Sequence, residues 1–368
     1  GIILAGGNSN KMRELTHKRA VAAMPIAGSY RAIDFALSNM SNSHIQKVAV
    51  LTRYNARSLN EHLNSSKWWD FGRKQGGLYV FTPTITAENG YWYRGTADAI
   101  YQNLDFLKRC HEPYVIITSG DAVYKMDYNK VLEYHIAKKA DITVVCKELG
   151  PNEDASRFGT IKMNDSMRIE EFEEKPMVAQ SQIVSTGIYV IRRRQLIDLI
   201  ERCAEDDRHD FVTDILIRYK NLKKIYGYKI KDYWSNISTV DAYYQTNMDF
   251  LKPEVREYFF RTQPGIYSKV SDLPPAKYNP GSMVKNSLVA SGSIINGTVE
   301  NSILFKKTFV GNNCVIKNSI ILNDVYLGDN AYIENCIVES RDTIRANTRY
   351  VGENGVKVVV EKNERYAL

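Results

Sequence analysis

A glycine-rich turn near the start of the chain carries residue types suited to binding phosphate. The apolar run Ile2–Leu4 has the composition of a short strand; it leads directly into Gly6 and Gly7, and Lys11 follows four residues later. Glycines after a strand let the backbone approach a phosphate, and the free N–H groups of such a turn attract anions. Because many strand–helix turns carry two glycines without binding a ligand, the turn alone indicates only a candidate anion site.

Two charged residues directly follow predicted strands, at the position where parallel sheets bind ligands. Asp121 comes after the apolar run 115–118 and a glycine, and Lys175 follows a strand-like segment and precedes a proline. Ligands of open α/β sheets lie outside the carboxyl ends of the strands. An aspartate there can hold a divalent cation, and a lysine can bind a phosphate. The alternatives are a helix cap for Asp121 and a solvated surface lysine for Lys175.

The elements that must position these residues form an α/β pattern over residues 1–255. Strand-like apolar runs alternate with amphipathic helical segments, which is typical of a mostly parallel sheet. The strands are apolar along their whole length, as expected when helices cover both faces. The predicted strands are 2–4, 48–51, 115–118 and 142–145, and the predicted helices are 33–40, 97–109 and 131–138. We therefore expect a Rossmann-like α/β domain with a mostly parallel sheet.

Beyond residue 255 the sequence changes character twice. The segment 263–281 contains four prolines, which predicts an extended connector over residues 256–281. From 282 to 368, aliphatic residues recur at steps of about five to eleven residues, with Asn and Gly between them; this predicts a left-handed parallel β-helix of hexapeptide repeats. An irregular β-sandwich is the alternative. The aliphatics expected to point into the coils include Ile316, Leu322, Ile333, Val338 and Ile344.

Composition excludes several classes of function. The 368 residues carry a net charge of +7, but acids are interleaved with the bases, so small anionic ligands are favoured over nucleic acid. No apolar run approaches the length of a membrane span. Five scattered cysteines without a C-x-x-C pair argue for a cytoplasmic protein rather than a disulfide framework or zinc site. All six histidines precede residue 210, so we expect a structural or regulatory β-helix, not an acyltransferase. The absence of an initial methionine leads us to expect that further residues precede Gly1.

Several longer motifs give the chain a specific family resemblance. Lys18-Arg19-Ala20 and the stretch from Gly28 to Asn39 follow the glycine turn. Later motifs are Trp92-Tyr93-Arg94-Gly95-Thr96-Ala97-Asp98, Ser119-Gly120-Asp121, Glu173-Glu174-Lys175-Pro176, Ser185-Thr186-Gly187 and Leu273-Pro274-Pro275. Over essentially its whole length, the chain resembles glucose-1-phosphate adenylyltransferase (ADP-glucose pyrophosphorylase) of bacterial glycogen synthesis. The resemblance implies that the phosphate of glucose 1-phosphate attacks the α-phosphorus of ATP, releasing pyrophosphate and forming ADP-glucose.

The resemblance also implies roles for individual residues. Lys11 and Asp121 match catalytic positions, and Asp121 with Asn236 matches the pair that holds Mg²⁺. The expected nucleotide-binding residues are Gly6, Gly7, Trp92, Tyr93 and Gly95. The expected sugar-phosphate residues are Glu174, Lys175, Ser185, Tyr189, Asp210 and Trp234. For the aromatic residues, core packing is the open alternative. Lys18, Arg19 and Arg31 match the site of anionic metabolite effectors, although Arg31 could equally be a structural ion-pair partner.

The departures from the family pattern fall on one half of the site. Where the family has a third glycine in the loop, this chain has Ser9. Where the family has a catalytic arginine, this chain has Lys11, whose ammonium is a point charge and lacks the planar fork of a guanidinium. At the position of the family's second metal-binding aspartate this chain has Asn236, whose side-chain carbonyl oxygen carries no charge. Further exchanges near the nucleotide are Val21, Ala22 and Arg53. Because these changes affect the triphosphate and its metal, the pattern indicates a weakened Mg²⁺ site with the sugar-phosphate half largely kept.

Three hypotheses follow. The first is a weakly active or inactive regulatory subunit that pairs with a homologous catalytic chain in a mixed tetramer and binds ATP, glucose 1-phosphate or ADP-glucose. The second is a fully active homotetrameric adenylyltransferase in which Lys11 and Asn236 suffice. The third is a stand-alone sugar-phosphate sensor. Neither nucleic acid nor a membrane is an expected partner.

Overall fold

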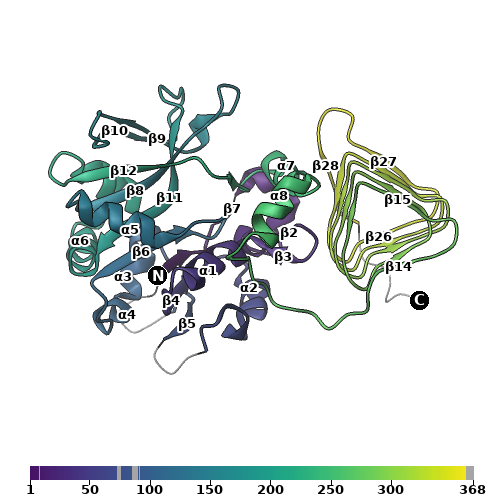
Figure 1. Cartoon of the computed structure of the whole chain (residues 1–368), viewed down its shortest axis with the longest axis horizontal. Helices are drawn as coiled ribbons and strands as arrows, with labels where there is room; N and C mark the ends of the chain where they lie inside the picture. The colour runs from purple at the N-terminus through teal and green to yellow at the C-terminus, as the bar shows by residue number, and fades with distance from the viewer. Residues whose placement is uncertain (8, 73–75, 85–89, 91, 362–368) are drawn as a thin grey trace.

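The computed structural model of the chain describes residues 1–7, 9–72, 76–84, 90 and 92–361 and shows an α/β domain beside a three-sided stack of coils (Figure 1). Asn8 of the glycine turn lies outside the described residues. Among the residues described, no helix is long and apolar enough to cross a membrane.

A nine-stranded mixed sheet forms the centre of the first domain. Strands β5, β4, β1 and β6 lie side by side and run parallel, and β11 then pairs antiparallel with β6. Beyond β11, β8 pairs with a parallel β12, and β9 pairs with an antiparallel β10. The bounds are β1 (Ile2–Leu4), β4 (Lys47–Leu51), β5 (Gly77–Phe81), β6 (Tyr114–Ser119), β8 (Ile142–Glu148), β9 (Gly159–Met163), β10 (Ile169–Glu174), β11 (Ile183–Arg192) and β12 (Ile225–Ile230). Two small sheets pair β2 (Pro25–Ile26) with β3 (Tyr30–Arg31) and β7 (Ala122–Tyr124) with β13 (Trp234–Asn236).

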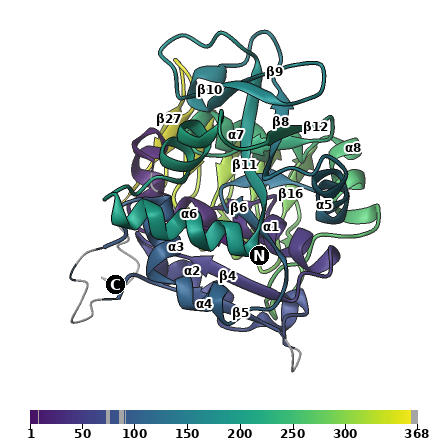
Figure 2. The same cartoon turned by 90° about the vertical axis from the view of Figure 1, so that its left-hand side faces the viewer.

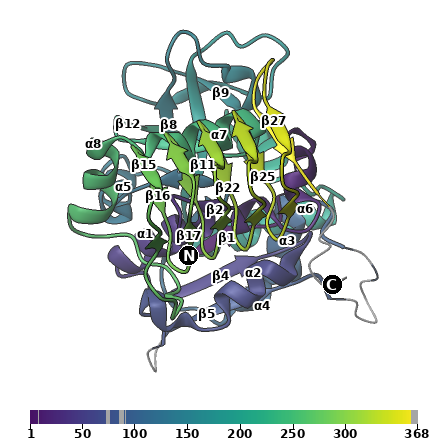
Figure 3. The ribbon, with the colours of Figure 1, turned by 90° about the vertical axis from the view of Figure 1, so that its right-hand side faces the viewer.

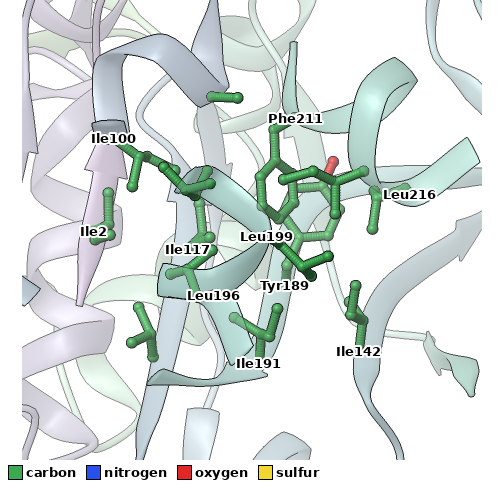
Figure 4. Packing of buried hydrophobic residues seen from close by; sticks show 14 of the residues in the cluster. Ile2, Ile100, Ile117, Ile142, Tyr189, Ile191, Leu196, Leu199, Phe211 and Leu216 are labelled. Atoms are coloured by element: carbon green, nitrogen blue, oxygen red, sulfur yellow. The ribbon is translucent and has the colours of Figure 1, made fainter. Parts of the chain in front are cut away.

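Helices cover both faces of this sheet, which explains why its central strands are apolar throughout. One face packs against α3, α4 and α6, which lie together in Figure 2, and Figure 4 shows part of that core. The other face packs against α1, α2 and α5. The bounds are α1 (Ala32–Asn42), α2 (Ala56–Leu63), α3 (Thr96–Gln102), α4 (Leu104–Lys108), α5 (Tyr128–Ala137), α6 (Arg193–Glu205), α7 (Val240–Asp249) and α8 (Pro253–Arg256).

The second domain consists of coils whose strands stack in three parallel five-stranded sheets, consistent with a left-handed β-helix (Figure 3). The first sheet comprises β14 (Lys277–Tyr278), β17 (Ile294–Ile295), β20 (Phe309–Val310), β23 (Tyr326–Leu327) and β26 (Thr343–Ile344). The second comprises β15 (Met283–Lys285), β18 (Thr298–Glu300), β21 (Val315–Lys317), β24 (Tyr332–Glu334) and β27 (Arg349–Val351). The third comprises β16 (Leu288–Val289), β19 (Ile303–Leu304), β22 (Ile320–Ile321), β25 (Cys336–Val338) and β28 (Lys357–Val359).

The coils turn at asparagines, which explains the Asn-rich spacing of the sequence. Asn313, Asn330 and Asn347 occupy equivalent corners with positive φ, a conformation that Asn tolerates better than most residues. Their side chains also form a ladder: Asn313 Nδ2 donates to Asn330 Oδ1 at 3.3 Å, and Asn330 Nδ2 donates to Asn347 Oδ1 at 3.0 Å.

The third sheet of the β-helix packs against the α/β domain through one continuous apolar core. Ile303, Ile320 and Ile337 point outward from the coils into a cluster that contains Phe35 and Phe259. Tyr244 on α7 donates to the carbonyl oxygen of Asn318, and Arg19 pairs with Glu339 at 2.5 Å. The two domains therefore form one packed body, and residues from both can contribute to one site.

The predicted fold class is confirmed, with local corrections. The four predicted strands and the helices at 33–40 and 131–138 are present. The predicted helix 97–109 is broken into α3 and α4, because the side chain of Asn103 donates back to the carbonyl oxygen of Ala99 at 2.8 Å. Leu322 does not point into the coils; it is buried in the interdomain core. The domain boundaries stay predictions.

Candidate functional site

The glycine turn and Asp121 lie side by side at the carboxyl edge of the parallel strands. The turn follows β1, Asp121 follows the neighbouring strand β6, and the N–H of Gly120 donates to the carbonyl oxygen of Leu4 at 3.0 Å. Gly6 is required by packing, since a Cβ there would lie 2.7 Å from the Cβ of Arg53, whereas a Cβ on Gly7 would meet nothing within 4 Å. The open backbone at Gly7 is therefore accessible to a ligand.

The residues expected to hold a metal are brought together, and one side-chain oxygen of each accepts a hydrogen bond from the protein. Asp121 Oδ1 accepts a hydrogen bond from Ser119 Oγ at 2.5 Å. Pairing of β7 with β13 places Asn236 opposite Ala122, and its Oδ1 accepts from the N–H and the Oγ of Ser238 at 3.0 and 2.5 Å. Over the residues that the structure describes, no group of three or more His, Cys, Asp or Glu side chains could hold a metal ion. The donor set does not fit a site with two carboxylates.

Ser9 links the glycine turn to the segment after β13. Its Oγ donates to the carbonyl oxygen of Ser238 at 2.6 Å, so the residue that replaces the loop's third glycine makes a contact that glycine could not make. Lys11 is an exposed residue of the 3-10 segment Asn10–Thr16. Hydrogen bonding from Ser156 lowers the pKa of Asp154, and the nearby charge of Lys11 adds to that effect. Lys11 is therefore an exposed cation close to Asp154.

Glu174 and Lys175 lie together at the end of β10. Lys175 has a positive φ of 47°, and its Nζ lies 3.4 Å from Glu174 Oε1 while its side chain stays 68% exposed. Burial raises the pKa of Glu174, and the charge of Asp210 contributes to the rise, whereas Lys175 opposes it. The structure thus brings Glu174, Lys175 and Asp210 into one neighbourhood with a lysine free to meet a phosphate.

The other expected sugar-pocket residues have mixed surroundings. Tyr189 is a core residue whose ring packs against that of Phe211 (Figure 4), with 5.1 Å between the ring centroids. Burial raises the pKa of its phenol. Only its hydroxyl reaches Ser185, with 3.4 Å between the oxygens. Asp210 accepts from the N–H of Thr213 and from Thr96 Oγ1 at 2.8 and 3.3 Å, so it also orders the local chain.

Trp234 has an unused hydrogen-bond donor. Its indole is buried and meets Phe158 edge to face at 5.5 Å, and its Nε1 is buried without a hydrogen-bond partner among the described residues. An unpaired buried donor costs about 1–3 kcal/mol, so a ligand hydroxyl that accepts from it would recover that free energy. This orphaned N–H supports a polar ligand beside β13.

Of the residues expected around the nucleotide, Tyr93 and Gly95 have packing roles. Tyr93 is buried in the core, where its hydroxyl accepts from Asn103 Nδ2 at 2.8 Å. Gly95 is required because a Cβ there would lie 2.3 Å from the carbonyl oxygen of His209. Trp92 is exposed and stacks on Tyr54 at 6.1 Å, with the guanidinium of Arg53 4.5 Å from the centre of the Tyr54 ring. The sequence interpretation missed Tyr54, because nothing local marks it as a partner of Trp92.

A cavity of about 1220 Å³ lies between the two domains and contains the three residues expected to bind effectors. Lys18 is exposed, Arg19 is paired with Glu339, and Arg31 donates from Nη1 to the carbonyl oxygen and Oγ of Ser58 at 2.7 and 3.0 Å. Burial lowers the pKa of Arg31. Further cations that sequence reasoning missed also line it: Arg57, Lys269, Lys306, Lys307 and Arg341. In the sequence, only the adjacent pair Lys306-Lys307 indicates a cluster of cations. The other residues are far apart in the chain and come together only where the two domains pack.

Comparisons with known proteins agree with this architecture. A protein-family model described as a nucleotidyl transferase matches residues 1–253, and one described as a GlmU-like, C-terminal hexapeptide matches residues 274–359. Nucleotidyl transferases of this kind generally use a divalent metal ion.

Curated relatives narrow the family further. The glucose-1-phosphate adenylyltransferase of Thermosipho melanesiensis is 39% identical over 317 residues, which cover 86% of this chain and 77% of that protein. The Clostridium novyi protein of that name is 39% identical, over 86% of this chain and 83% of its own length. The Clostridium botulinum protein is 41% identical, over 86% and 82%. The resemblance found in the sequence is confirmed, and the chain belongs to the glucose-1-phosphate adenylyltransferase family of nucleotidyl transferases.

Proposed function

We propose that this chain is a subunit of glucose-1-phosphate adenylyltransferase in glycogen biosynthesis, and that it is a weakly active or inactive regulatory partner of a catalytic subunit. The reaction of the assembly joins ATP and glucose 1-phosphate to give ADP-glucose and pyrophosphate. The observation that carries this proposal is the arrangement around Asn236, which has no charge and directs its Oδ1 at Ser238. Mg²⁺ at Asp121 would keep a single protein carboxylate, so its site is weakened.

The sugar-phosphate half supports retained binding of ADP-glucose or glucose 1-phosphate. Lys175 is free to meet a phosphate, Glu174 and Asp210 lie near it, and Trp234 holds an unused donor. Such binding needs only positioning and hydrogen bonds, whereas phosphoryl transfer also needs the developing charge to be neutralised. We therefore propose that this chain still binds ADP-glucose or glucose 1-phosphate although its catalytic activity is weak or lost.

Regulation is assigned to the interdomain cavity. Its cations come from both domains, so an anionic metabolite bound there would contact the α/β domain and the β-helix together. A bound anion changes activity only if it favours one state of the assembly over another. A mixed tetramer with a homologous catalytic chain, and a cytoplasmic location, complete the proposal.

The regulatory role is tested with a mixed complex. We expect the full chain to co-purify with a catalytic homologue and to shift the midpoint of its activation by an anionic effector by about fivefold or more, a typical coupling. The measurement is pyrophosphate release as a function of effector concentration. The Asp121→Asn variant should shift the curve equally, because the chain acts here through assembly and not through its own turnover. Failure to form a complex, or identical curves with and without the chain, would contradict regulation.

Ligand binding by the sugar half is tested with Trp234→Phe and Lys175→Ala. We expect Trp234→Phe to weaken ADP-glucose binding several-fold, because it removes a donor that has no partner among the described residues and is available to the ligand. Lys175→Ala should weaken binding about tenfold or more, because a charged hydrogen bond to phosphate is lost. Calorimetry on the full chain measures both. If the wild-type chain bound neither ADP-glucose nor glucose 1-phosphate, the retained-site proposal would be wrong.

A further inference from the structure

Arg157 is a cation that neither the sequence motifs nor the proposed function uses, and it lies beside the weakened metal site. It ends the 3-10 turn Ala155–Arg157, just before β9, and is half-buried against the ring of Phe158. Its Nη2 donates a long hydrogen bond of 3.5 Å to Ser238 Oγ. The Ser238 hydroxyl is the same group that donates to Asn236, so Arg157 adjoins the residue that replaced a metal carboxylate.

Three carboxylates surround this guanidinium closely enough for their charges to act on it. Burial lowers the pKa of Arg157, and the negative charges of Asp154, Asp241 and Asp121 oppose that lowering. An arginine remains protonated in proteins, so the site contains a fixed positive charge near Asp121. A divalent cation beside Asp121 would have to share this space with that charge.

Arg157 also has unused hydrogen-bonding capacity. Within the part of the chain that the structure describes, its Nε is buried and has no hydrogen-bond partner. An unpaired donor is costly for a charged group unless a ligand or solvent supplies an acceptor. Ser238, which Arg157 contacts, is also bonded to the glycine turn, because Ser9 Oγ donates to the carbonyl oxygen of Ser238. The guanidinium therefore contacts the serine that is hydrogen-bonded both to Ser9 of the glycine turn and to Asn236.

We propose that the guanidinium of Arg157 takes the place of a divalent cation in this chain, so that a sugar nucleotide binds without metal. The inference rests on the proposed retention of ADP-glucose binding. Guanidinium is planar and can donate two parallel hydrogen bonds to phosphoryl oxygens, and it offsets the charge of Asp121 that would otherwise repel them.

Calorimetry with ADP-glucose on the full chain, in EDTA or in excess MgCl₂, tests this assignment. We expect the wild-type dissociation constant to change less than about twofold between the two conditions. Arg157→Gln should weaken binding in EDTA by about tenfold or more, the effect expected for loss of a charged hydrogen bond. Mg²⁺ should restore part of that loss, because the carboxylates are then free to attract it. The affinity of Arg157→Lys for ADP-glucose in EDTA should lie between those of the wild type and Arg157→Gln, because lysine keeps the positive charge but lacks the planar guanidinium.

A second readout does not depend on the nucleotide. Titration with Mn²⁺, followed by electron paramagnetic resonance, should find weaker binding in the wild-type chain than in Arg157→Gln. Arg109→Gln, which removes an exposed arginine paired with Asp105 on α4, is the matched control and should change neither measurement. Circular dichroism verifies that each variant is folded.

The outcomes separate this inference from the proposed function. Wild-type binding that requires Mg²⁺, or an Arg157→Gln chain that binds as the wild type does in EDTA, would overturn the role of Arg157 and leave the proposed function intact. No binding of ADP-glucose by the wild type in either condition would reject the retained sugar-nucleotide site itself.

Discussion

The isolated chain should release pyrophosphate from ATP and glucose 1-phosphate at a rate on the order of 10⁴-fold below that of a catalytic relative. Two preorganised charges differ from the family pattern: Lys11 stands for an arginine and Asn236 for an aspartate. Loss of one such group costs on the order of 10²- to 10³-fold, or about 2.7–4 kcal/mol, so two losses at the lower end give about 10⁴-fold. The two losses should be roughly additive only if the groups act independently. Steady-state assay of the purified chain without a partner measures this rate.

Restoring the family's residues at the altered positions tests the same prediction in the opposite direction. Asn236→Asp with Lys11→Arg should raise turnover, but Ser9 should limit the gain because its hydroxyl ties the glycine turn to Ser238. Adding Ser9→Gly should therefore raise it further. Lys67 is an exposed lysine over the ring of Trp68, and Lys67→Arg, the matched control for a lysine-to-arginine exchange elsewhere on the surface, should have no effect. Wild-type turnover within about tenfold of an ordinary family member would contradict the regulatory assignment.

The local sequence was sufficient to predict those features of the fold that depend on residues close together in the chain. The apolar run before Gly6 and the run before Asp121 predict two strands, and both are present as the adjacent strands β1 and β6. The asparagine-rich corners of the coils follow from backbone preference at each position, so the β-helix was also predictable. The parallel half of the sheet and the position of the glycine turn followed from these elements.

Contacts between distant segments were not predictable in the same way. Arg157 becomes part of the site only because β7 pairs with β13, which places Ser238 beside it. Arg19 matches an effector position in the sequence, yet its Nη2 is held by Glu339, 320 residues later. Tyr189 matches a sugar-pocket position, but its ring fills the core. A motif specifies which residue types are present, whereas the surrounding packing decides which of their atoms remain free.

Anion binding in the interdomain cavity should depend strongly on cations from both domains. Lys18 lies on the α/β domain, and Lys306 lies on the β-helix, where burial lowers its pKa and its Nζ donates to Ser271 Oγ at 3.0 Å. We expect Lys18→Ala with Lys306→Ala to weaken binding of a doubly phosphorylated sugar by about 10²-fold, because each charged hydrogen bond contributes about 1.5–3 kcal/mol. Calorimetry measures the loss. Lys285→Ala, on the second sheet of the β-helix, should leave the affinity unchanged.

The same cavity should bind anions more tightly as the pH falls through about 7. Burial raises the pKa of Asp342 to about 7, and the neighbouring charges of Glu339 and Glu361 add to the rise, whereas Lys18 opposes it. Below that pH the carboxyl is neutral, and above it a negative charge lies in the cavity and repels the ligand. Sulfate, whose charge is constant between about pH 6 and pH 8, is the suitable probe, and removal of one like charge should change its affinity several-fold. Asp342→Asn should bind sulfate at high pH as the wild type does at low pH, with little dependence on pH between them. Sulfate affinity that rises with pH in the wild type, or an equal pH dependence in Asp342→Asn, would show that another group controls the charge of this cavity.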